Sequence, residues 1–127
     1  MNEWLAVAGG GALGASARYG VYLLVAHTVG VGFPWATPLV NIAGSLAMGV
    51  LVELTALLWL PAPWLRDFLA VGFLGAFTTF STFSLDVVTL WERDRVAATV
   101  AYVLASGVLS VLACVGGMVA TRRLLGP

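Results

Sequence analysis

The residues best suited to chemistry lie in one stretch, 72–84, where glycine and hydroxyl-bearing residues are mixed with aromatic ones. The stretch contains two glycines, three threonines, two serines and four phenylalanines. Glycine and β-branched threonine weaken a helix, and in lipid a loosened backbone must be satisfied by protein or by a water-filled cavity. The stretch therefore predicts a break in a membrane helix, at a place where something polar binds or passes. The alternative is a small-residue packing face whose hydroxyls bond back to their own helix.

The residue types in this stretch favour a small anion as the polar species. The edge of an aromatic ring is positive, and Phe80 and Phe83 are three residues apart, so two ring edges could meet one dehydrated anion. Conduction needs weak, multiple sites, which neutral groups offer and rings of fully charged side chains do not. This argument does not identify the anion. Ordinary core packing of the two phenylalanines remains the alternative.

Other polar side chains fall inside apolar stretches, where each is costly and needs a reason. Asn41 offers two amide donors, which suit an anion or a hydrogen bond between helices. Tyr102, Ser106 and Ser110 share one helical face, and their hydroxyls could line a pathway or bond between helices. Arg18 could place a positive potential near an anion's entrance, or its side chain could extend to the membrane surface.

The elements that must position these residues are membrane helices. Of the 127 residues, 61% are hydrophobic and 9% are charged, and the mean hydropathy is +1.00, whereas about a quarter of the residues of a soluble domain are charged. The N-terminal apolar stretch is followed by uncharged stretches of 34, 18 and 26 residues, and a membrane helix needs roughly 20. We expect one all-α membrane domain, residues 1–127, with four transmembrane helices over about 4–26, 37–59, 64–90 and 96–120.

Several residue types are absent, and their absence argues against other functions. The chain has no lysine, and its single histidine lies near a predicted connector. We find no metal-ligand cluster, no phosphate loop, no nucleophilic triad and no basic patch, so we expect neither an enzyme nor a nucleic-acid-binding protein. A proton-coupled transporter usually has an ionisable side chain at mid-membrane. This chain has no carboxylate there.

The arginines give only a weak signal for orientation in the membrane. With four spans, Arg66, Arg122 and Arg123 would lie on one side, and Arg93 and Arg95 on the other. A Lys/Arg excess normally marks the cytoplasmic side, and three against two is a weak bias. Copies could insert in both orientations and form an antiparallel dimer, or all copies could insert in one orientation with the termini inside.

The chain resembles the Fluc family of fluoride channels, also called CrcB, over its whole length. Three motifs carry the resemblance. Residues 10–19, GGALGASARY, resemble the family's GGxxGAxxRY, and residues 41–45, NIAGS, resemble its Asn-x-x-Gly-Ser. Residues 75–84, GAFTTFSTFS, resemble its GGxTTFSTFS, with Ala76 where the family usually has a second glycine.

This resemblance implies a dual-topology, antiparallel homodimer in the lipid bilayer, with two pores that export fluoride passively across the cytoplasmic (inner) membrane of a prokaryote. Phe80 and Phe83 would be the ring-edge ligands of fluoride, and Arg18 would lie near a vestibule. The other pore residues would be Asn41, Ser81, Thr82, Tyr102 and Ser110. A structural sodium ion at the dimer interface would be held by the backbone carbonyls of Gly75 and Thr78. No organic cofactor is implied.

Two other classes of membrane protein stay open. A small multidrug exporter also has four spans and antiparallel dimers, but it needs a membrane-embedded glutamate in its first span. Here that span has only Glu3 at its outer edge. A structural subunit of a larger membrane complex is the second alternative, and it would tolerate leucine at Phe80 and Phe83.

Overall fold

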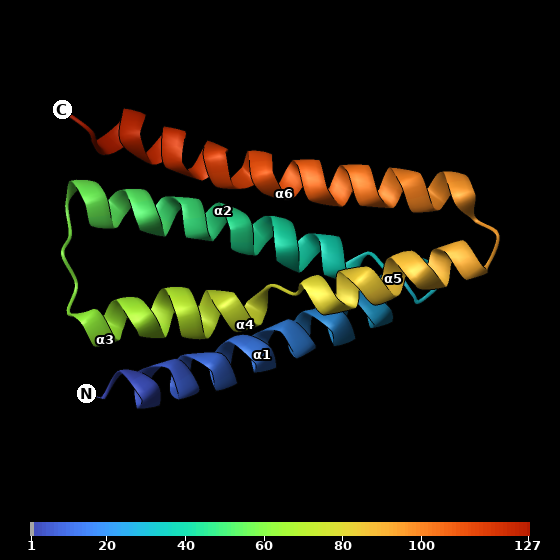
Figure 1. Ribbon diagram of the computed structural model, residues 1–127, viewed down its shortest axis with the longest axis horizontal. Coiled ribbons are helices and arrows are strands. Elements are labelled where there is room, and N and C mark those ends of the chain that lie inside the picture. Colours follow the sequence, from blue (N-terminus) through green and yellow to red (C-terminus); the bar gives the residue numbers. More distant parts are fainter. Residues whose placement is uncertain (1) are drawn as a thin grey trace.

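The computed structural model describes residues 2–127 and is built from helices, with no strand among those residues (Figure 1). In chain order the elements are α1 (Glu3–Thr28), α2 (Ala36–Leu57), α3 (Pro63–Arg66), the π-helix η1 (Asp67–Leu74), α4 (Gly75–Phe77), α5 (Phe80–Glu92) and α6 (Val96–Leu125). The predicted all-α fold is confirmed. Both termini lie at one end of the molecule, together with the connector between α2 and α3.

Three helical segments are long and apolar enough to cross a membrane, namely Ala36–Leu57, Pro63–Glu92 and Val96–Leu125. They correspond to the second, third and fourth predicted spans. At 1.5 Å per residue, the 26 residues of α1 are also long enough for a hydrocarbon core about 30 Å thick. However, α1 contains Arg18 and several glycines and is less apolar, so the first span stays a prediction.

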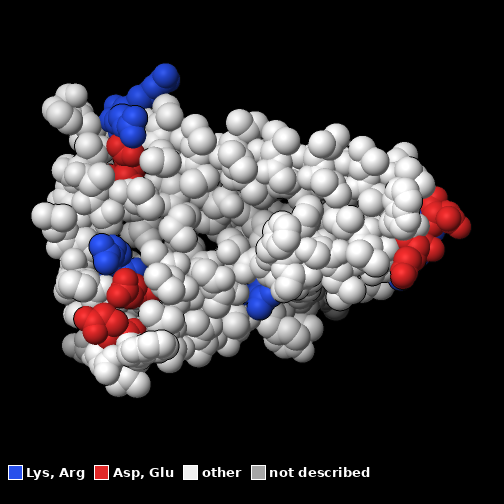
Figure 2. Space-filling view, viewed as in Figure 1, with Lys and Arg blue, Asp and Glu red and all other residues white. Residues whose placement is uncertain are grey.

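The surface of the protein is largely apolar, as expected for helices surrounded by lipid. Large apolar side chains are exposed along every long helix, among them Leu13, Leu104 and Val111. Figure 2 shows that charged side chains gather near the two ends of the visible face, while the region between them is mostly uncharged. This distribution fits helices that run from one membrane surface to the other.

The long helices form two closely packed pairs, α2 with α6 and α1 with η1 and α4 (Figure 1). Glycines allow the backbones to approach each other. A Cβ atom at Gly10 or Gly14 of α1 would overlap the backbone of η1, and one at Gly49 of α2 would overlap the carbonyl of Cys114 in α6. Gly10 and Gly14 therefore pack against another helix of the same chain.

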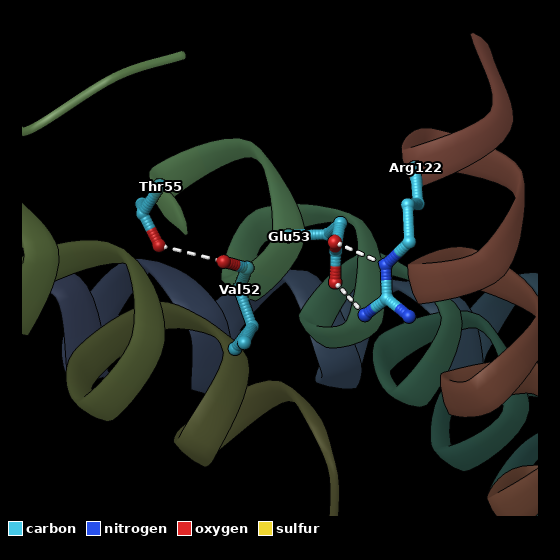
Figure 3. Close-up of polar contacts among 4 residues, drawn as sticks. All are labelled: Val52, Glu53, Thr55 and Arg122. Atoms are coloured by element: carbon cyan, nitrogen blue, oxygen red, sulfur yellow. Dashed lines mark hydrogen bonds and ion pairs between the residues drawn. The ribbon is translucent and has the colours of Figure 1, made fainter. Parts of the chain in front are cut away.

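An ion pair joins α2 to α6 near the end that holds the termini (Figure 3). Glu53 is 4% exposed. Arg122 donates from Nε to Glu53 Oε1 at 2.7 Å and from Nη2 to Oε2 at 2.9 Å. This two-point geometry satisfies both oxygens of a carboxylate that would be costly to bury alone, and it fixes α6 against α2.

The close packing of α6 on α2 yields a prediction for two neighbouring glycines. A Cβ atom at Gly117 would lie 2.5 Å from the Leu46 carbonyl oxygen, whereas one at Gly116 would meet nothing within 4 Å. We predict that Gly117→Ala lowers the free energy of unfolding by about 1–3 kcal/mol through overpacking. Gly116→Ala, the matched control, should be neutral or slightly stabilising because alanine favours a helix. Thermal unfolding of both variants in the same detergent tests this, and equal midpoints would contradict the packing.

Candidate functional site

The third helical segment changes its backbone conformation between α4 and α5. Thr78 has φ −83° and ψ 157°, and Thr79 has φ −151° and ψ 121°, so both residues are extended. The segment before them is also irregular, since η1 is a π-helix and the Gly75 N–H reaches back five residues to the Ala70 carbonyl. π-Helical turns are rare and frequently mark functional sites.

Asn41 of α2 holds the extended residues in place. Its Oδ1 accepts a hydrogen bond from the Thr79 N–H at 2.7 Å, and its Nδ2 donates to the Thr79 carbonyl oxygen at 2.9 Å. The side-chain amide thus exchanges two bonds with one residue, as the backbones of paired antiparallel strands do. A primary amide has two N–H donors, so one remains for another acceptor.

The change of conformation at Thr78 and Thr79 removes two carbonyl groups from helical hydrogen bonding. In a continuous α-helix the Thr79 N–H would bond the Gly75 carbonyl, and the Thr82 N–H would bond the Thr78 carbonyl. Instead the Thr79 N–H bonds Asn41, and the Thr82 N–H bonds Thr79 Oγ1 at 3.2 Å. The carbonyl oxygens of Gly75 and Thr78 therefore lack their usual helical partners.

Thr79 also starts the next helix. Its Oγ1 accepts from the Thr82 N–H as an N-cap of α5, which satisfies one of the free donors at a helix start. The same oxygen lies 3.3 Å from Ser81 Oγ and 3.2 Å from Thr82 Oγ1. The hydroxyls of Ser81 and Thr82 are thus grouped around the capping residue.

A cavity of about 240 Å³ lies beside the extended residues. It is lined by Asn41, Ser45, Thr78, Thr79, Phe80, Phe83, Ser106, Gly107 and Ser110. No charged side chain belongs to this lining. Within residues 2–127, Ser110 Oγ is the buried side-chain polar atom that has no hydrogen-bond partner. A buried hydroxyl without a partner is costly, so the cavity offers a donor that is free for a ligand.

The two phenylalanines meet at this cavity. Their ring centroids are 5.5 Å apart, with planes tilted by 40°. Phe80 is 78% exposed, so most of its ring faces away from the chain. Phe83 has a second neighbour, the ring of Tyr102, whose centroid is 5.5 Å away and whose plane differs by 15°.

The structure brings together only part of the predicted site. Asn41, Phe80, Phe83 and Ser110 share the cavity. The other three predicted pore residues do not line it. Ser81 is exposed, and Tyr102 is buried behind Phe83. Thr82 lines a second cavity, also of about 240 Å³, with Arg18, Ala15, Tyr19 and Tyr22.

Ser106, which the sequence placed on a possible pathway face, also lines the cavity, together with three residues that were given no role of their own, namely Ser45, Thr79 and Gly107. Spacing could have indicated Ser45, because it follows Asn41 by one helical turn. Thr79 and Gly107 had no comparable signal.

Comparison with known proteins identifies the family. The family described as "CrcB-like protein, Camphor Resistance (CrcB)" matches residues 5–118. The chain belongs to this family. A protein of Rhodospirillum centenum named fluoride-specific ion channel FluC is 55% identical over 125 residues, which cover 98% of this chain and 96% of the relative.

Two further relatives carry the same name. The protein of Paracoccus denitrificans is 51% identical over 123 residues, with 97% of each chain covered. That of Chelativorans sp. is 46% identical over 125 residues, which cover 98% of this chain and all of the relative. The CrcB family resemblance seen in the three sequence motifs is confirmed.

The bond pair between Asn41 and Thr79 makes a testable prediction about backbone protection. We predict that Asn41→Leu speeds hydrogen exchange of the Thr79 amide about tenfold, because it removes the acceptor of that N–H. Ser45→Ala, one turn along α2, should leave this exchange unchanged. Hydrogen exchange followed by mass spectrometry of peptides spanning 72–84 measures both. Unchanged exchange in Asn41→Leu would contradict the pairing.

Proposed function

We propose that this protein is a passive, fluoride-selective channel, a multi-pass protein of the prokaryotic inner membrane. The observation that carries the proposal is the cavity beside Thr78 and Thr79, where the Ser110 hydroxyl lacks a partner and no charged side chain is present. The ion is suggested by the relatives, which are named fluoride-specific ion channels. These names also count against an enzyme, a multidrug exporter and a structural subunit.

The chemistry of the cavity supports an anion. Fluoride holds its hydration shell strongly, so a pathway must replace lost water with other hydrogen-bond donors. Ser110 Oγ has no partner, and Asn41 has an N–H beyond the one bonded to Thr79. Phe80 and Phe83 can add the positive edges of their rings. Each of these contacts is neutral and individually weak, which favours release as well as entry.

We further propose that two copies assemble in antiparallel orientation, each inserted in the opposite sense. Phe80 belongs to the cavity yet is 78% exposed, so one chain leaves this part of the pathway without a wall. A second copy of the chain would cover the ring and enclose an ion beside it. The nearly even distribution of arginines between the two ends of the helices supports insertion in both orientations.

We also propose a structural sodium ion at the centre of this dimer. The carbonyl oxygens of Gly75 and Thr78 fit a hard cation, because both have lost their helical hydrogen-bond partners. Irregular backbone inside a membrane is tolerated where its polar groups are satisfied by protein, water or ions. When bound, sodium would supply a positive charge that fixes the two carbonyls. The residues that shape them are Asn41 and Thr79.

The rings of Phe80 and Phe83, the ring pair of the cavity, allow the first functional test. We predict that Phe80→Ile and Phe83→Ile each abolish fluoride efflux from proteoliposomes while the dimer still assembles, because an aliphatic side chain has no positive edge. A fluoride electrode measures efflux, and cross-linking measures assembly. Phe68→Ile, in η1 and outside the cavity lining, is the matched control. Efflux at the wild-type rate in either pore variant would remove that ring from the pathway.

A charged side chain placed in the cavity allows a second functional test. We predict that Asn41→Asp strongly inhibits fluoride efflux, because a carboxylate there repels an approaching anion in a medium of low dielectric constant. Asn2→Asp makes the same substitution at an exposed position outside the cavity and should conduct normally. Efflux is measured in the same assay, and undiminished efflux from Asn41→Asp would place the pathway elsewhere.

A further inference from the structure

A carboxylate close to the ring pair has no role in the site described so far. Asp86 of α5 is half-buried, and its Oδ2 accepts a hydrogen bond from the Tyr102 hydroxyl at 2.7 Å. A negative charge near an anion pathway raises the barrier to the anion. Asp86 would therefore hinder conduction unless it also supports conduction in another way that outweighs this repulsion.

The Tyr102 ring connects Asp86 to the cavity. Tyr102 is 3% exposed, and its ring lies parallel to that of Phe83 with centroids 5.5 Å apart. The Tyr102 ring also contacts the Phe33 ring, with the two centroids 5.8 Å apart and the planes at 71°. Phe83 in turn contacts Phe80. In this set of four rings, Tyr102 alone has a hydroxyl, and that hydroxyl is bound to Asp86.

We propose that Asp86 is a positioning residue of the channel, whose carboxylate fixes Tyr102 so that the Tyr102 ring holds Phe83 at the cavity. The inference rests on the proposed fluoride channel function. It assigns Asp86 an effect on conduction that is transmitted by ring packing and requires no contact between Asp86 and the ion.

The donor count of tyrosine supports this role. A tyrosine hydroxyl has one hydrogen to donate. While that hydrogen is bonded to Asp86, the hydroxyl cannot donate to fluoride, so Tyr102 acts on the pathway through its ring. A hydrogen bond to a charged acceptor is also stronger than one between neutral groups, which suits a bond whose purpose is to restrict the ring.

The surroundings of Asp86 reduce the electrostatic cost of this arrangement. Arg93 lines a cavity of about 190 Å³ together with Asp86, and its positive charge opposes the field of the carboxylate. On another side, Asp86 shares a cavity with the hydrogen-bonded hydroxyls of Tyr22 and Thr37. Phe80 lines neither of these cavities.

The test is a mutant cycle on fluoride efflux from proteoliposomes, with chloride efflux recorded in parallel. We expect Asp86→Ala and Tyr102→Phe each to lower fluoride efflux about tenfold, the loss expected when one hydrogen bond no longer holds the ring. The double variant should be no worse than either single one, because both remove the same interaction. Asp86→Asn keeps an acceptor oxygen and should recover most of the efflux. Glu92→Gln, which removes another carboxylate from α5, is the matched control.

Several outcomes would overturn the proposal. If the charge of Asp86 acted directly on the ion, Asp86→Ala and Asp86→Asn would raise efflux equally, and would do so in a Tyr102→Phe background as well. Unchanged efflux in Asp86→Ala, or additive losses in the double variant, would also contradict it. If Asp86→Ala failed to fold, Tyr102→Phe would decide the question, because it removes only the hydroxyl.

A second readout does not depend on conduction. Fluorine NMR of protein carrying 4-fluorophenylalanine should show a shifted or broadened Phe83 resonance in Asp86→Ala and an unchanged one in Glu92→Gln. An unchanged Phe83 resonance in Asp86→Ala would overturn the positioning role. Absence of fluoride efflux from the wild-type protein would instead count against the proposed function, while this resonance would still test the contact.

Discussion

The hydrogen bonds between the Asn41 side chain and the Thr79 backbone are the constraint on which the rest of the site depends. They let two residues of a membrane helix stay extended without leaving the Thr79 N–H and carbonyl unsatisfied. They also free the Gly75 carbonyl from its helical bond. The turn that follows starts a new helix at Phe80, capped by Thr79, and this start sets where the ring pair lies.

The packing of the helices brings the two partners of this interaction together. Asn41 and Thr79 are 38 residues apart in the chain, so their meeting depends on how α2 lies against the third helical segment. A Cβ atom at Gly44, close to Asn41 on α2, would overlap the Thr78 side chain, which shows how little space separates them. On the other side of the cavity, the Glu53–Arg122 ion pair and the close glycine contacts between α2 and α6 fix the position of α6. The cavity forms between these two fixed surfaces.

Much of this arrangement could be predicted from the sequence, because the bilayer permits few backbone structures. A long uncharged stretch can satisfy its backbone hydrogen bonds in lipid by forming a helix. The motif at residues 75–84 indicated Thr78, Phe80 and Phe83 as candidate site residues. The pairing of Asn41 with Thr79 and of Glu53 with Arg122 could not be predicted, because each depends on helix rotation and register. The same is true of Tyr102, whose position behind Phe83 depends on how α6 packs on α5. Ser81 and Thr82 share a motif with Phe80 but point to different surroundings.

The proposed function requires that the neutral cavity beside the extended residues Thr78 and Thr79 conducts fluoride selectively. The most direct test is efflux from liposomes containing purified wild-type protein, measured under a fluoride gradient and then under an equal chloride gradient, with no pH gradient across the membrane. We expect rapid fluoride release and little chloride release. Equal release of both ions, or no fluoride release from folded protein, would contradict it.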